Sequence, residues 1–188
     1  MILYINSCVR ADSRTDKIAR ALLGKYHKEY VELYLPEEDL KPLSKELLDK
    51  RTALIEKDDY SDPLFGYAKQ FAKADKIIIS APFWDFSFPA ILKLYIENIY
   101  VTGIVSKYGN DGMPIGLCKA DELIFVTTAG GPYIADFGYN YIKTLAIQCF
   151  GIKNVRLIKA EMLDIEGADV ESILSDVIDK LPQYGTFE

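Results

Sequence analysis

The segment from Ser7 to Thr15 holds residue types that could bind an anion. Ser7, Ser13 and Thr15 supply hydroxyl groups, and Arg14 supplies a positive charge. The segment lies between an apolar run and the predicted start of a helix, where free backbone N–H groups and the helix dipole favour negative charge. We therefore expect a phosphate-binding loop here, although a serine at this place can also serve only as a helix cap.

The same segment contains a candidate nucleophile. Cys8 is followed by five residues and then by Arg14 and Thr15. This is the spacing of tyrosine phosphatases, in which a thiolate attacks phosphorus while loop amides and an arginine bind the oxygens. The motif lies between a strand and a helix near the N-terminus, and this placement resembles that in low-molecular-weight tyrosine phosphatases and arsenate reductases. These enzymes also need a general acid, usually an Asp-Pro late in the chain, whereas Asp62-Pro63 comes early. A phosphatase using Cys8 and Arg14 remains the alternative interpretation.

Two more segments could line a ligand site, because each directly follows an apolar run. Residues 81–88 read APFWDFSF, and such aromatic side chains either pack under neighbouring loops or wall a flat ligand. Residues 127–133 read TTAGGPY, and Gly130 and Gly131 permit positive φ and a close approach of backbone to a ligand.

Composition narrows the class of protein. The chain has 188 residues, 49% of them hydrophobic, and a net charge of −6, which indicates one soluble domain over residues 1–188. This charge disfavours nucleic-acid and anionic membrane surfaces as partners. Three widely spaced cysteines and no signal peptide predict a reducing cytoplasm. His27, the only histidine, is expected at a solvated helix end, so we expect no histidine-based metal site and chemistry that belongs to a cofactor.

Strand and helix patterns alternate along the whole chain. Short apolar runs predict five strands, and the second, which alternates polar and apolar residues, is typical of an edge strand. The β-α alternation predicts an α/β fold with three layers (α/β/α) and a five-stranded parallel sheet in the flavodoxin-like order 2-1-3-4-5. The strands are expected at 2–5, 30–35, 76–80, 123–126 and 155–158, and the helices at 13–26, 45–56, 62–71, 89–100, 136–150 and 170–181, with a loop at 102–120 and Pro182 closing the last helix.

In such folds, ligands lie outside the carboxyl ends of the strands, near the switch point between strands 1 and 3. The phosphate-binding loop, the aromatic segment and the glycine segment all fall there. A ligand with a phosphate tail and a flat ring would use all three, and FMN is such a ligand.

The motifs in these three loops, together with the helix that follows the aromatic segment, resemble those of a known protein family. The chain resembles the FMN-dependent NADH-azoreductase and NAD(P)H:quinone oxidoreductase family, whose fold is flavodoxin-like. The resemblance runs in order along residues 1 to about 180. It rests on Ser7, Ser13-Arg14-Thr15, Ala81-Pro82-Phe83-Trp84-Asp85-Phe86, Leu92-Lys93-Leu94-Tyr95-Ile96-Glu97 and Thr128-Ala129-Gly130-Gly131.

The resemblance implies a role for each loop. The phosphate of FMN would be held by Ser7, Ser13, Arg14 and Thr15. The ring and ribityl chain would be lined by Pro82, Phe83, Trp84, Asp85 and Phe86. The other edge of the ring would be approached by Thr128, Ala129, Gly130 and Gly131. Tyr133, which follows the two glycines, either donates a hydrogen bond near the acceptor or simply packs against its neighbours.

The resemblance also implies a reaction and an assembly. NADH or NADPH would reduce FMN, and a quinone or azo compound would then take the two electrons in a ping-pong order. Members work as homodimers with sites at the interface, which would explain why the helix at 89–100 is apolar nearly all round. Asp85 stands where the family usually has Asn, and Ser106 stands where it often has Phe. A one-electron flavodoxin carrier and a protein that only binds partners are the remaining interpretations.

Overall fold

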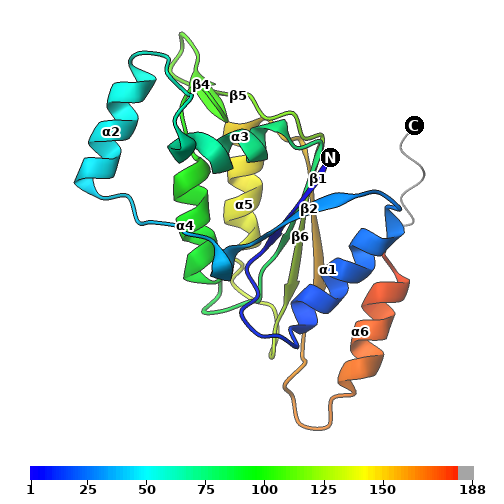
Figure 1. Ribbon diagram of the computed structural model, residues 1–188. Coiled ribbons are helices and arrows are strands. Elements are labelled where there is room, and N and C mark those ends of the chain that lie inside the picture. The colour runs from blue at the N-terminus through cyan, green and yellow to red at the C-terminus, as the bar shows by residue number, and fades with distance from the viewer. Residues whose placement is uncertain (182–188) are drawn as a thin grey trace.

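A computed structural model of the chain describes residues 1–181, so Pro182 lies outside the described residues. Five parallel strands form the central sheet in the order β2-β1-β3-β6-β7, which confirms the predicted order (Figure 1). Within the sheet, β2 is an edge strand, as its alternating sequence indicates. The strands are β1 (Ile2–Asn6), β2 (Tyr30–Tyr34), β3 (Lys76–Ser80), β6 (Glu122–Thr128) and β7 (Asn154–Ala160).

Helices cover both faces of the sheet, which confirms the three layers. On one face α1 (Arg14–Lys25) and α6 (Val170–Asp179) lie side by side (Figure 1). The opposite face is covered by α3 (Gly66–Lys73), α4 (Ala90–Ile99) and α5 (Tyr139–Leu145). The remaining helix, α2 (Lys45–Ile55), has no buried residue and lies outside α4.

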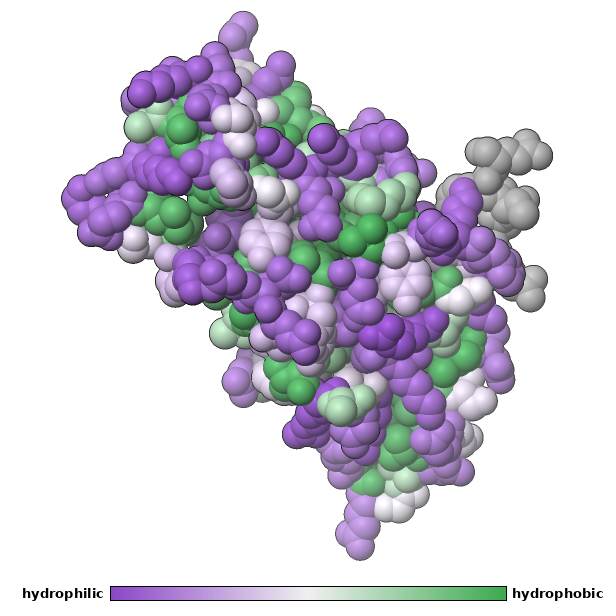
Figure 2. Space-filling model, viewed as in Figure 1, coloured by the Kyte–Doolittle hydropathy of each residue, from purple (hydrophilic) through white to green (hydrophobic). Residues whose placement is uncertain are grey.

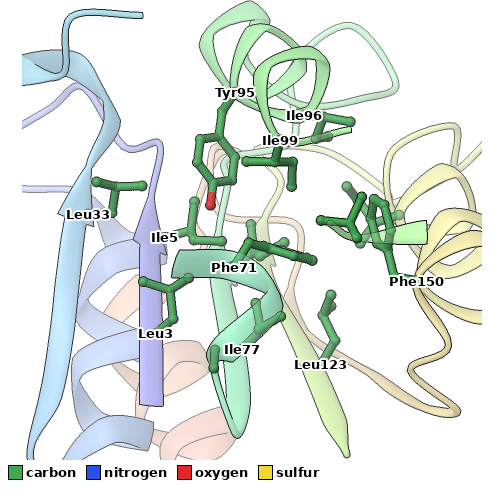
Figure 3. Close-up of a cluster of buried hydrophobic side chains, with 14 of the residues drawn as sticks. Leu3, Ile5, Leu33, Phe71, Ile77, Tyr95, Ile96, Ile99, Leu123 and Phe150 are labelled. Carbon is green, nitrogen blue, oxygen red and sulfur yellow. The ribbon is translucent and has the colours of Figure 1, made fainter. Parts of the chain in front are cut away.

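The two faces of the sheet have separate cores because side chains alternate along each strand. Leu3 and Ile5 of β1 and Ile77 of β3 point towards α3 and α4, where they meet Phe71 and Tyr95 (Figure 3). Tyr4 of β1 and Ile78 of β3 point the other way, towards α1 and α6. The three central strands are fully buried over residues 2–6, 76–80 and 122–127, which explains their nearly continuous apolar runs.

Four predicted elements differ in part from those observed: the loop at 102–120, the helix at 136–150, the strand at 30–35 and the helix at 62–71. The predicted loop at 102–120 contains a two-stranded antiparallel sheet of β4 (Ser106–Tyr108) and β5 (Pro114–Gly116). The helix predicted from Asp136 begins only at Tyr139, and its last turn, Ala146–Phe150, is a π-helix. Three-residue 3₁₀ helices occur at Leu35–Glu37 and Pro63–Phe65. His27 lies beyond the end of α1, at a φ of 47°.

The apolar helix α4 is covered largely by its own chain. Leu92, Ile96 and Ile99 are buried in the core. Arg51 of α2 donates hydrogen bonds to the carbonyl oxygens of Glu97 and Tyr100 at the helix end. The apolar character of α4 therefore does not by itself require a second subunit.

The surface is mainly polar. Figure 2 shows hydrophilic side chains over most of one face of the molecule, with apolar side chains in smaller areas between them. No helix within residues 1–181 is both long and apolar enough to cross a membrane.

Candidate functional site

The three predicted loops meet at the carboxyl ends of β1, β3 and β6, where they enclose a cavity of about 220 Å³. Nine of the predicted site residues line it: Ser13, Arg14, Thr15, Pro82, Phe83, Trp84, Thr128, Ala129 and Gly130. Five further residues complete the lining: Val9, Arg10 and Asp12 of the first predicted loop, and Leu163 and Asp164, which the sequence did not single out.

The first loop presents the N-terminus of α1 to the cavity. Ser13 is the N-cap, and its Oγ accepts a hydrogen bond from the backbone N–H of Asp16 at 3.3 Å. The hydroxyl of the buried Thr15 lies 2.6 Å from that of Thr128, which links the first loop to the end of β6. Ser13 therefore caps the helix and also lines the cavity.

Ser7 takes a different position from the other hydroxyl residues. Its side chain is fully buried, and its Oγ donates to the carbonyl oxygen of Ser80 at 2.8 Å. Its backbone N–H donates to the same oxygen at 3.0 Å. Ser7 thus holds β1 against β3 and is absent from the residues that line the cavity.

A tight turn carries the aromatic side of the cavity. The backbone groups of Trp84 and Ser87 exchange both hydrogen bonds, at 3.2 and 2.8 Å. Between them Asp85 and Phe86 have φ values of 50° and 63°. Asn, Asp and Gly occupy this left-handed region most readily, so an Asp at position 85 meets the same backbone demand as the usual Asn. The turn directs Phe83 and Trp84 to the cavity, whereas Asp85 and Phe86 lie outside its lining.

Gly130 leaves room for a neighbouring side chain and has no positive φ, contrary to one reason for expecting a glycine here. Neither Gly130 nor Gly131 has a positive φ. A Cβ on Gly130 would lie within 3.0 Å of the carboxylate of Asp164, whereas a Cβ on Gly131 would meet nothing. The backbone N–H of Asp164 also donates to the carbonyl oxygen of Gly130 at 2.8 Å. Asp164 is therefore packed directly on the glycine segment.

Asp164 also connects that segment to the first loop. Its Oδ1 accepts a hydrogen bond from Nη1 of Arg14 at 2.6 Å. Both side chains are substantially exposed, so the pair contributes little to stability. The pair instead holds the guanidinium at the cavity, beside the helix N-terminus. Asp12 and Asp164 give the lining two carboxylates against the two guanidinium groups of Arg10 and Arg14.

Tyr133 lies beside the aromatic wall. Its ring centroid is 4.5 Å from that of Phe83, and Nζ of Lys159 lies 5.0 Å from the centre of the Tyr133 ring. The backbone N–H of Tyr133 donates to Glu161 at 2.7 Å. Burial raises the pKa of the hydroxyl, so that it stays protonated and able to donate.

Cys8 is poorly placed to act as a nucleophile. The residue is only 2% exposed and does not line the cavity. Its Sγ lies 3.5 Å from Oγ of Ser80, below the loop. Burial raises the pKa of the thiol, whereas a phosphatase needs a thiolate at neutral pH. These observations oppose the phosphatase interpretation.

A thiol-labelling experiment can check this assignment. In a variant with Cys118→Ser and Cys149→Ser, the remaining Cys8 is expected to react with an aromatic disulfide reagent at pH 7 at least about 100-fold more slowly in the native than in the urea-unfolded chain. The rate is followed by absorbance of the released thiolate. Cys8→Ser is expected to leave FMN binding unchanged. Rapid labelling of the native chain would contradict the assignment.

Two wider hollows lie at the opposite end of the sheet. They measure about 600 and 640 Å³ and are lined mainly by charged residues, among them Lys76 and Asp121 in both. They adjoin the amino ends of the strands. Ligands of open parallel sheets bind at the carboxyl ends, so the smaller cavity is the candidate site.

Comparison with known proteins identifies the family of the chain. A family model described as flavodoxin-like fold matches residues 1–184. An FMN-dependent NADH:quinone oxidoreductase of Coprothermobacter proteolyticus is 35% identical over 195 residues, covering 97% of this chain and 96% of that protein. The chain belongs to this flavodoxin-like oxidoreductase family. Another member, the FMN-dependent NADH:quinone oxidoreductase of Clostridium beijerinckii, is 36% identical over 190 residues, covering 95% of this chain and 94% of that protein.

Solved structures of similar fold extend the comparison. An azoreductase from Bacillus anthracis superposes with a TM-score of 0.84 at 22% identity, covering 96% of this chain and 95% of that one. An FMN-dependent NADH-azoreductase from the same species, solved in complex with FMN, gives a TM-score of 0.79 at 20% identity, with 96% and 94% covered. At these identities, the comparison shows that the oxidoreductase family and the azoreductases share the fold of this chain.

Proposed function

We propose that the chain is an FMN-dependent NAD(P)H oxidoreductase that passes two electrons to quinone or azo acceptors in a ping-pong order. The observation that carries this proposal is the single cavity formed by a helix N-terminus, an aromatic turn and a glycine segment at the carboxyl ends of three neighbouring strands. The names of its relatives, which are 35% and 36% identical, support the same function.

The lining of the cavity fits the chemistry of FMN. A phosphate would be held by backbone N–H groups at the start of α1, by Ser13 and Thr15, and by Arg14, whose guanidinium already lies there. A flat ring would be lined by Phe83 and Trp84. On the other side, the backbone of Thr128, Ala129 and Gly130 would come close to the ligand.

The residues around the cavity would position the reactants and exclude water. Bound FMN supplies the hydride chemistry, as in other flavin enzymes. Phe83 and Trp84 provide an apolar surface on which a nicotinamide or a quinone ring can stack. Tyr133 lies beside Phe83 but outside the cavity lining, and its buried hydroxyl would donate a hydrogen bond to an acceptor only after a local rearrangement that exposes it. The electron donor, NADH or NADPH, and the electron acceptor would use the same cavity, so they would occupy it in turn.

We further propose that the chain works as a homodimer in the cytoplasm. The cavity of about 220 Å³ is smaller than the 300–1,000 Å³ usual for ligand sites, so a second copy would complete the enclosure. Apolar side chains beside the cavity are exposed, including Phe86 at 48% and Phe137 at 67%. The backbone N–H of Phe137 donates to the carbonyl oxygen of Phe86 at 3.0 Å, so the two residues belong to one surface.

A binding and reduction experiment tests the function. The purified chain is expected to retain FMN after desalting, with absorption that disappears when NADH is added without oxygen and returns when a quinone is added. Arg14→Ala is expected to raise the Kd of FMN about tenfold, because it removes a charge-assisted hydrogen bond to phosphate, and to leave the Kd of riboflavin unchanged. Both Kd values are measured by quenching of flavin fluorescence.

A matched variant controls for the loss of positive charge. Lys17→Ala removes a cation from the same helix, but Lys17 pairs with Glu171 on the surface and does not line the cavity. Its Kd for FMN is expected to stay within about twofold of the native value. A native chain that binds no FMN would overturn the proposal, and equal effects of the two variants would overturn the role of Arg14.

A further inference from the structure

The phosphate-binding loop is attached to the fold at its two ends. Between them, residues 9–12 are exposed and belong to no helix or strand. At the first end Ser7 and Cys8 follow β1, and at the second Ser13 and Asp16 begin α1. The groups that fix these two ends therefore decide where the loop presents its N–H groups and Arg14.

One side chain contacts both ends. The amide of Asn6, the last residue of β1, is only 2% exposed. Its Oδ1 accepts from the backbone N–H of Cys8 at 3.0 Å. Its Nδ2 donates to Oδ1 of Asp16 at 3.1 Å. Asn6 thus bridges the residue that enters the loop and the first turn of the helix that leaves it.

Each of the two amide atoms makes a second hydrogen bond, and these two bonds anchor Asn6 to the neighbouring strands. Oδ1 also accepts from Oγ of Ser80 on β3 at 3.1 Å. Nδ2 also donates to Oε1 of Glu32 on β2 at 3.0 Å. An Asn amide has two donor hydrogens and two acceptor lone pairs, and Asn6 uses all four. Rotating the amide by 180° would place the Nδ2 donor against the N–H of Cys8 and the Oδ1 acceptor against the carboxylate of Asp16. The orientation of the amide is therefore fixed.

Tyr4 adds a second contact to the same carboxylate. Its buried hydroxyl donates to Oδ1 of Asp16 and lies 2.8 Å from Oγ of Ser80. Arg20 closes the group from outside, with Nε 2.8 Å from Oδ2 of Asp16 and Nη2 2.7 Å from Oε1 of Glu32. The Asp16 carboxylate is thus held by three donors, two from β1 and one from α1 itself.

We propose that Asn6, assisted by Tyr4, is a positioning residue that holds the phosphate-binding loop in the conformation in which it recognises the flavin phosphate. The inference rests on the proposed function. Neither side chain lines the cavity, so both act through Cys8 and Asp16. Their removal should affect the part of the ligand that meets this loop and spare the part that meets the aromatic turn.

Comparing FMN with riboflavin, which lacks the phosphate, tests the inference. Asn6→Asp keeps the shape but replaces both donor hydrogens by an acceptor that faces Asp16 and Glu32. It is expected to lower the preference for FMN over riboflavin about tenfold, with the Kd of riboflavin changed less than about twofold. Tyr4→Phe removes one donor and is expected to lower the preference about threefold. Fluorescence quenching gives the Kd values, and circular dichroism verifies folding.

Asn98→Asp is the matched control. Asn98 also donates two hydrogen bonds through Nδ2, to the carbonyl oxygens of Lys41 and Leu94, far from the cavity. The preference of the Asn98→Asp variant for FMN over riboflavin is expected to equal that of the native chain. An unchanged preference in folded Asn6→Asp, or in Tyr4→Phe if Asn6→Asp does not fold, would overturn the inference, as would equal losses for FMN and riboflavin. A native chain that binds neither flavin would instead overturn the proposed function.

Discussion

Replacing Gly116 by alanine is expected to lower the free energy of unfolding by about 3 kcal/mol, because a new methyl group would overlap backbone that cannot move aside. Gly116 ends β5, where it packs against the end of the π-helix. A Cβ there would lie within 3.0 Å of the backbone of Phe150 and Gly151. Gly151 has a φ of 81°, and the N–H of Cys118 donates to the carbonyl oxygen of Phe150 at 3.2 Å.

Urea unfolding followed by circular dichroism measures this loss. Gly24→Ala is the matched control, since Gly24 lies inside α1 and a Cβ there would meet no atom within 4 Å. Alanine loses less backbone entropy than glycine in a helix, so this control should raise the stability by about 0.5–1 kcal/mol. If both substitutions change the free energy of unfolding in the same direction, the close approach of β5 to the π-helix is wrong.

Replacing Glu122 by glutamine is expected to cost about 3 kcal/mol of stability. Glu122 begins β6, and its side chain is 6% exposed, as is that of its partner Lys76 on β3. It also accepts a hydrogen bond from Nε of Arg156 at 2.7 Å. The substitution removes the carboxylate that balances a buried ammonium, and the cost of burying that charge then falls on the folded state.

Two further variants separate this effect from the loss of an ordinary ion pair. Glu97→Gln breaks the exposed pair with Lys93 on α4 and is expected to change stability by less than about 0.5 kcal/mol. Lys76→Met combined with Glu122→Leu replaces both buried charges by apolar groups, and is expected to recover most of the loss. Thermal unfolding of all four chains provides the comparison. A loss in Glu122→Gln no larger than in Glu97→Gln would contradict the buried-charge explanation.

The sheet was predictable because burial on both faces demands continuous apolar runs. Residues 77–79 and 123–126 are such runs, and both lie in central strands. The hairpin of β4 and β5 was missed because its strands have only three residues and contain Pro114 and Gly116, which are turn signals by themselves. The late start of α5 was missed because the apolar Phe137 falls within the helix expected at 136–150, whereas it is exposed and precedes α5.

The site was predictable as three loops, since topology alone brings the ends of neighbouring strands together. Individual roles were harder to predict. Asp164 lies in a loop with no motif, and only its contacts with Gly130 and Arg14 across the fold give it a role. Positive φ values were expected at Gly130 and Gly131, but they occur at Asp85 and Phe86. The reason is that these two are the central residues of a tight two-residue turn. Ser7 resembled a ligand-binding hydroxyl, but its bond to Ser80 required the register of two strands.

The contact between Arg14 and Asp164 sets an order of events during biosynthesis. The two residues lie 150 positions apart along the chain. At about 5–20 residues per second, translation reaches Asp164 roughly 8–30 s after Arg14. During that interval β1, β3 and α1 can form on the ribosome, but the cavity lacks the wall that holds the guanidinium. Arg14 can therefore take its final position only after translation has passed Asp164, and a chain truncated before β7 is expected to bind FMN more weakly than the full chain.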